Sequence, residues 1–265
     1  MKLSISNIAW EANDDEKVYR IISDKGYSGL EIAPTRIFPD NPYEKKEDAL
    51  EWARKLKVEY GLEISSMQSI WYGRQEKIFG EETERKILID YTKLAIDFAA
   101  IIGCKNIVFG CPRNRNISSD DDYFKGVSFF RELGEYAYNK GTVIGMEANP
   151  PIYNTNFINN TSDALKLIND VDSMGFKLNL DVGTMLENIE KVELLESNVK
   201  HINHVHVSEP GLKIIKRRSL HKELLNLLHK FNYSGYISIE MGKVDNIDAL
   251  IETLSYISEL VKIRE

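Results

Sequence analysis

Short apolar runs rich in β-branched residues alternate, from one end of the chain to the other, with longer stretches whose apolar positions recur at helical spacing. The short runs are typical of buried parallel strands, and the longer stretches are typical of amphipathic helices. The pattern predicts eight strands and eight helices. The predicted strands cover residues 2–9, 29–33, 62–70, 105–112, 143–150, 177–183, 201–210 and 236–242. The helices with the clearest limits cover residues 14–25, 45–60, 81–102, 118–139, 161–173 and 247–263.

Strict alternation of strand and helix favours a parallel sheet, and eight such units favour a closed (β/α)8 TIM barrel of the α/β class. The chain has 265 residues, 43% of them hydrophobic, which is enough for the core of one barrel spanning residues 1–265. We find no linker, low-complexity tract or shift in composition that would divide it. Thr161 and Ser162 are predicted to cap the helix that they begin, and Gly175 is predicted to end it.

Charge and composition narrow the class of partner. A net charge of -7 and a pI near 5.4 argue against non-specific binding to nucleic acid or to an anionic membrane. The first ten residues, MKLSISNIAW, lack the pattern of a secretory signal, and no apolar run approaches the length of a membrane span. We therefore expect a cytoplasmic protein, with buried thiols at Cys104 and Cys111.

Four successive predicted strands end in side chains that can bind a metal. They are the runs that end at Glu147, at Asp181, at the pair His204 and His206, and at Glu240. In a barrel of this kind the functional groups come from the carboxyl ends of the strands, so these side chains should surround one opening. Carboxylates with one imidazole suit a single divalent ion such as Mn, Co, Mg or Zn.

A simpler explanation exists for each of these residues on its own. A carboxylate at a strand end is often a helix N-cap or a partner in a loop ion pair. The conjunction of four such ends, in apolar runs where an isolated charge is costly, favours the metal site. His204 and His206 lie two positions apart and share one face of their strand, so one is expected to bind the metal and the other to support it.

Four segments give the chain a resemblance to a known family: NFINNTSDALKLINDV, KLNLDVGTM, HINHVHVSEPGL and GYISIEM. Together with the alternating pattern, they make nearly the whole chain similar to the xylose isomerase-like TIM barrel superfamily of sugar phosphate isomerases and epimerases. The resemblance implies that one divalent metal is bound by Glu147, Asp181, His206 and Glu240. It also implies that Glu147 and Glu240 form the acid/base pair, as they would in the ketose 3-epimerases of that family.

Two positions depart from many members of that family. Thr184 stands where a histidine often follows the aspartate of the sixth strand, and Pro150 stands where several epimerases carry an arginine. Thr184 can donate a hydrogen bond but cannot act as a general base. The identity of the substrate therefore cannot be carried over. Candidate substrate contacts near the strand ends are Trp10, Glu31, Gln68, Asn149, Thr184, His204 and Glu209.

The expected activity is a metal-dependent isomerisation or epimerisation of a small carbohydrate, by proton transfer next to a carbonyl group. A dehydratase acting on an inosose or a dehydroshikimate-like compound would use the same groups, and a barrel that binds metal without catalysis is a further alternative. An apurinic endonuclease is disfavoured, because the first histidine is His201 and the chain is acidic. The basic residues Lys213, Lys216, Arg217 and Arg218 could grip a phosphate or a row of hydroxyls, but a solvated loop face or pairing with nearby carboxylates is the stronger expectation. Association into a homo-oligomer is left open.

Overall fold

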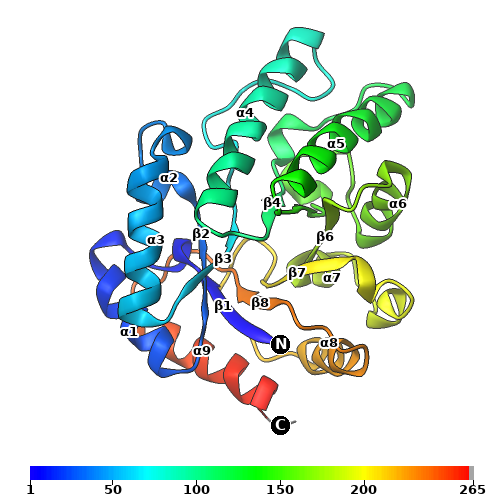
Figure 1. Cartoon of the computed structure of the whole chain (residues 1–265). Coiled ribbons are helices and arrows are strands. Elements are labelled where there is room, and N and C mark those ends of the chain that lie inside the picture. The colour runs from blue at the N-terminus through cyan, green and yellow to red at the C-terminus, as the bar shows by residue number, and fades with distance from the viewer. Residues whose placement is uncertain (263–265) are drawn as a thin grey trace.

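The computed structural model describes residues 1–262 and contains a closed barrel of eight parallel strands paired in chain order, with β8 beside β1. Figure 1 shows the helices as an outer layer around these strands. The predicted TIM barrel is therefore confirmed. The strands are β1 (Lys2–Ser6), β2 (Gly29–Ile32), β3 (Glu63–Met67), β4 (Ile107–Phe109), β5 (Ile144–Met146), β6 (Phe176–Asp181), β7 (Ile202–Val207) and β8 (Tyr236–Ile239).

A helix follows every strand, and one additional short helix, α2, lies between β2 and α3. The last helix reaches Lys262, and its predicted end at residue 263 lies outside the described residues. No described helix is both long enough and apolar enough to cross a membrane. The helices within residues 1–262 are α1 (Asp15–Asp24), α2 (Pro34–Ile37), α3 (Lys46–Tyr60), α4 (Glu82–Ile101), α5 (Asp121–Asn139), α6 (Thr161–Val171), α7 (Val182–Glu187), α8 (Ser219–Lys230) and α9 (Ile247–Lys262).

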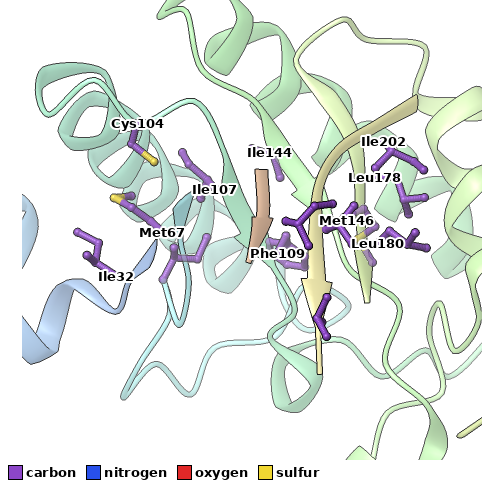
Figure 2. Packing of buried hydrophobic residues seen from close by; sticks show 14 of the residues in the cluster. Ile32, Met67, Cys104, Ile107, Phe109, Ile144, Met146, Leu178, Leu180 and Ile202 are labelled. Atoms are coloured by element: carbon purple, nitrogen blue, oxygen red, sulfur yellow. The ribbon is translucent and has the colours of Figure 1, made fainter. Parts of the chain in front are cut away.

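The two faces of the barrel strands differ in chemistry. One face carries large apolar side chains that join the core shared with the helices, and Figure 2 shows those from β4, β5 and β6 together. The alternate positions carry small or polar side chains, which meet across the barrel interior in hydrogen bonds such as Ser4–Ser65 (2.6 Å) and Asn106–Ser66 (2.9 Å). The strands thus bury an apolar layer outside the barrel and a polar layer inside it.

Gly145 shows how tightly the polar layer is packed. A Cβ atom at this position would lie 2.7 Å from Asn106 Oδ1 and 3.0 Å from Asn179 Cβ. Asn106 Nδ2 donates to Asn179 Oδ1 at 3.3 Å. Glycine on β5 therefore leaves room for the hydrogen bond that joins β4 to β6 across this side of the barrel.

Most predicted strands run past their observed ends, as at β4 (predicted 105–112) and β5 (predicted 143–150), and three other predicted boundaries were wrong for a local reason. Helix α6 is capped by Asn160, whose extended backbone lets its side chain accept from the Asp163 amide at 2.8 Å, whereas Thr161 is already helical. The same helix ends at Val171 because Asp172 takes a left-handed conformation, well before Gly175. Strand β1 ends at Ser6 rather than at residue 9, because residues 7–9 form a 3₁₀ turn.

Candidate active site

Four potential metal ligands meet at the carboxyl ends of β5 to β8. Glu147 follows β5, Asp181 ends β6, His206 lies near the end of β7 and Glu240 follows β8. One donor atom from each of these four side chains lies within 4.8 Å of the other three. His206 Nδ1 is 3.0 Å from Glu147 Oε1 and 3.2 Å from Glu240 Oε2. The four side chains thus point their donor atoms toward one small volume.

The two nitrogens of His206 face different groups. Its Nε2 lies 2.7 Å from Glu31 Oε2, so a proton on Nε2 can be donated to that carboxylate and Nδ1 is left to face Glu147 and Glu240. A carboxylate behind the imidazole is the usual way in which a metal-binding histidine is oriented. His204 is fully buried beside the same carboxylate, with Nε2 3.3 Å from Glu31 Oε2. Of the two histidines, His206 therefore offers the nitrogen that faces the carboxylate group.

Neutral amides hold the two glutamates. Asn179 Nδ2 donates to Glu147 Oε1 at 2.9 Å, and Asn149 Nδ2 donates to Glu147 Oε2 at 3.2 Å. Gln68 Nε2 donates to Glu240 Oε1 at 2.9 Å. Each glutamate thus receives a hydrogen bond from a group that carries no charge, which fixes its orientation without neutralising it.

Asp181 combines two roles that the sequence left as alternatives. Its Oδ1 accepts from the Thr184 amide at 2.5 Å and caps α7, while the Ser208 hydroxyl donates to Oδ2. Asp181 also belongs to the group of four donors. The helix cap therefore orients a carboxylate that still faces the other three potential ligands.

The electrostatics of the site favour a bound cation. Burial, followed by the charge of Glu147, raises the pKa of Asp181 to about 6, and burial raises the pKa of Glu240 to about 7. Burial opposes a charge on His206, but Glu240 and Glu31 raise the pKa of this imidazole well above its usual range. Among residues 1–262, no lysine or arginine forms an ion pair with Glu147, Asp181 or Glu240. Three oxygen donors and one nitrogen donor, with no lysine or arginine paired to them, fit a divalent ion.

A cavity of about 190 Å³ opens at this cluster. Gln68, Asn149 and Glu209, three of the predicted substrate contacts, line it together with Glu147, Asp181 and Glu240. A larger groove of about 820 Å³ lies at the opposite ends of β7 and β8, beside Asn203 and Tyr233. We assign the candidate site to the smaller cavity, because the carboxylates and His206 converge there.

The other four predicted substrate contacts are placed away from the cavity lining. Trp10 lies beyond the end of β1, where it is buried against Tyr19 and its indole nitrogen donates to Asp15 Oδ1 at 2.8 Å. Glu31 and His204 are buried below the ligand cluster, inside the barrel. Thr184 is buried and donates its hydroxyl proton to the Ala148 carbonyl at 2.7 Å. None of these four side chains lines the cavity.

Several residues of the site were not anticipated from the sequence. Asn179 lies two positions before Asp181, so it shares the inward face of β6, and that spacing could have identified it. Tyr153 lines the cavity, and its hydroxyl accepts from the Gly211 amide at 2.9 Å. Arg115, in the loop after β4, is fully buried beside Asn149. Burial of an arginine in a loop leaves no signal in the sequence.

The basic loop after β7 pairs with carboxylates, as expected. Arg218 Nε donates to Glu209 Oε1 at 2.9 Å, and the Lys216 amide donates to the same oxygen at 3.1 Å. Arg217 lies 3.9 Å from Glu259 and over the ring of Tyr256. The two arginines are thus engaged by the protein itself.

Comparisons with known proteins agree with the fold. A family model described as xylose isomerase-like TIM barrel matches residues 19–260. The chain is similar to the structure of 3-keto-D-glucoside 4-epimerase, YcjR, from E. coli, with 21% identity, a TM-score of 0.77 and coverage of 98% of this chain and 99% of the other. It is also similar to D-allulose 3-epimerase from Methylomonas sp. in complex with D-allulose, with 18% identity, a TM-score of 0.74 and coverage of 100% and 97%.

A structure described as AP endonuclease, family 2 from Brucella melitensis is similar to the same degree, with 15% identity, a TM-score of 0.75 and coverage of 98% and 99%. A search of curated proteins gives no match. At these identities the similarity extends to the barrel, and the chemistry has to be argued from the side chains.

Proposed function

The chain belongs to the xylose isomerase-like TIM barrel family, and from that premise we propose that it is an isomerase or epimerase of a small sugar. The reaction would transfer a proton at a carbon next to a carbonyl group. The observation that carries this proposal is the convergence of Glu147, Asp181, His206 and Glu240, with donor atoms within 4.8 Å, beside a cavity. The names of the similar structures, which include sugar epimerases, are consistent with it.

We propose that one divalent ion, such as Mn, Co, Mg or Zn, is held by these four side chains. The fit rests on three carboxylates and one imidazole whose donor atoms converge, with no lysine or arginine paired to the carboxylates among the described residues. When bound, the ion would act as a Lewis acid toward the carbonyl oxygen, where negative charge develops as the proton leaves.

The protein groups would carry the proton. Glu147 would take it from the carbon on one face of the sugar, and Glu240 would return a proton from the other face. The amides of Asn179 and Gln68 would keep the two carboxylates in orientation, because each donates to one of them at 2.9 Å. Glu31 would hold the His206 ring through its Nε2 atom.

The cavity favours a small and uncharged substrate. Its volume of about 190 Å³ is below the roughly 300–1,000 Å³ of pockets for drug-sized ligands. Glu147, Asp181, Glu209 and Glu240 line it and can accept hydrogen bonds from hydroxyls. Even with one divalent ion bound and Arg218 paired with Glu209, these four carboxylates keep a net negative charge that disfavours a phosphate group. We therefore propose a free sugar or keto-sugar rather than a sugar phosphate.

The test is a panel of ketoses, keto-glycosides, inososes and their phosphates, incubated with Mn²⁺ or Co²⁺ in deuterated water. Uptake of deuterium next to the carbonyl, read by NMR, is expected for a free sugar. Loss of water with a new conjugated absorbance would identify a dehydratase instead. Metal binding without exchange on any member of the panel would contradict the proposed activity.

Replacing either glutamate should separate the proton transfer from metal binding. Glu147→Gln and Glu240→Gln retain one oxygen ligand but remove the base, so the exchange rate should fall by roughly 10²–10⁴-fold. The affinity for Mn²⁺, measured by calorimetry, should fall much less. Exchange by both variants at the wild-type rate would show that neither carboxylate moves the proton.

A further inference from the structure

Arg115 is a charged side chain buried beside the candidate base without a carboxylate to pair with. It lies in the loop after β4 and has no exposed surface. Within residues 1–262 no carboxylate forms an ion pair with it, and its Nε atom has no hydrogen-bond partner. Burial lowers the pKa of Arg115 to about 10, so the guanidinium stays charged at neutral pH. Burying a guanidinium without a charged partner costs free energy, which suggests that Arg115 has a specific role at this site.

The contacts of Arg115 converge on the residues around Glu147. Its Nη2 donates to the Glu147 carbonyl oxygen at 3.0 Å and to Asn149 Oδ1 at 2.7 Å. Its Nη1 lies 3.6 Å from the sulfur of Met146, and its own carbonyl accepts from Thr155 Oγ1 at 2.8 Å. The side chain thus links the end of β5 with the loop that follows it.

The contact with Asn149 fixes the direction of that amide. Because a guanidinium can only donate, Asn149 must present its oxygen to Arg115, and its Nδ2 must then point the other way. Nδ2 donates to Glu147 Oε2 at 3.2 Å and to the Ala148 carbonyl at 3.1 Å. Asn149 is thus the side chain that joins the Arg115 guanidinium to the Glu147 carboxylate, beside the hydrogen bond from Arg115 to the main chain of Glu147.

We propose that Arg115 is a positioning residue that orients the carboxylate of Glu147 through the amide of Asn149. The assignment of Glu147 as base and ligand comes from the proposed function, on which this inference rests. Arg115 locks Asn149, and Asn149 holds Oε2 of Glu147 while Asn179 holds Oε1. Without the guanidinium the Asn149 amide can rotate, and its oxygen would then face and repel the carboxylate.

The chain offers a matched control for the test. Arg131 on α5 is exposed and also donates to two carbonyls, those of Val171 at 3.0 Å and Asp170 at 2.8 Å. Arg131→Met removes the same kind of contact far from the cavity. We would compare Arg115→Met, Asn149→Ala, the double variant and Arg131→Met by circular dichroism, Mn²⁺ calorimetry and steady-state kinetics.

Arg115→Met and Asn149→Ala should each weaken Mn²⁺ binding by about tenfold, as loss of groups that hold a ligand commonly does. The double variant should be no weaker than Arg115→Met alone, because that change already releases Asn149. On a substrate found by the panel, Arg115→Met should lower kcat by about tenfold or more with KM within about threefold. Arg131→Met should change none of these values.

Two results would overturn the proposal. One is a double variant whose loss of Mn²⁺ affinity equals the product of the two single losses, and the other is a folded Arg115→Met variant whose Mn²⁺ affinity is unchanged. Calorimetry needs no substrate, so either result stands even when the panel finds no activity. If Arg115→Met does not fold, Arg115→Lys keeps the charge but has no fork to engage both acceptors, so its affinity for Mn²⁺ should still fall. Unchanged Mn²⁺ affinity of folded Arg115→Lys would then overturn the proposal.

Discussion

Replacing Glu31 tests whether the site depends on a carboxylate that lies outside both the cavity lining and the four proposed metal ligands. Glu31 is fully buried and lies 2.7 Å from His206 Nε2, 3.3 Å from His204 Nε2 and 3.4 Å from Gln68 Nε2. Burial alone would raise the pKa of Glu31, but the charge of His206 and hydrogen bonds from both imidazoles outweigh it and lower the pKa. Glu31 is therefore an ionised acceptor for His206 and Gln68, with His204 Nε2 close to the same carboxylate.

The change Glu31→Gln keeps the size of the side chain and one acceptor oxygen, but removes the charge and adds an NH₂ group among donors. A hydrogen bond to a charged group is worth about 1.5–3 kcal/mol, and a neutral one about 0.5–1.5 kcal/mol. The difference, about 1.5 kcal/mol, corresponds to roughly tenfold weaker binding of Mn²⁺ if it acts through the His206 ring.

The assay is a calorimetric titration of Mn²⁺ into each protein, with urea unfolding curves to verify that the variant is folded. Glu63→Gln is the matched control, because Glu63 pairs at the surface with Lys57 at 2.8 Å and such pairs contribute about 0–1 kcal/mol. It should leave Mn²⁺ affinity unchanged. Folded Glu31→Gln that binds Mn²⁺ as tightly as the wild type would refute the view that Glu31 orients His206.

Two further predictions concern stability. Burial lowers the pKa of His221 to about 4, so the unfolded chain, with an ordinary pKa near 6.5, binds more protons between these values. The free energy of unfolding should therefore fall as pH drops through that window, by about 2 kcal/mol at pH 5. Urea unfolding of the wild type and of His221→Gln at pH 7.5 and pH 5 measures this fall, which should be smaller in the variant. An equal fall in both proteins would contradict the prediction. Asn160→Ala should lower the free energy of unfolding by about 1 kcal/mol through loss of the α6 cap, and a cost no greater than that of Ser162→Ala would contradict the assignment of Asn160 as the cap.

The barrel was predictable because its pattern is repeated eight times. Each run of β-branched residues between helical stretches predicts a strand that is covered on one face by helices. The convergence of Glu147, Asp181, His206 and Glu240 was predictable for the same reason, since the carboxyl ends of parallel strands meet at one face of a barrel. Their binding of a metal remains a prediction.

The substrate contacts were harder to predict, because nearness to a strand end does not fix depth in the barrel. Glu31 lies on an inward position of β2 but below the cavity, where it meets His206. Trp10 lies beyond a 3₁₀ turn that the alternating pattern does not reveal. Arg115 comes from a loop, and its burial depends on the position of Asn149, 34 residues away. Such placements follow from tertiary packing rather than from local pattern.

The closure of the barrel by β8 has a consequence for the biosynthesis of the protein. Gln68, which follows β3, contacts Glu240, which follows β8 and lies 172 residues later in the sequence. Glu31 on β2 contacts His206 on β7, 175 residues later. At roughly 5–20 residues per second, a ribosome needs about 10–35 s to make the chain between such partners. Until then Gln68 lacks its partner Glu240, and Glu31 lacks its partner His206 until β7 is made. We therefore expect the proposed ion to bind late, because the four proposed ligands can be complete only after β8 has left the ribosome and joined β1.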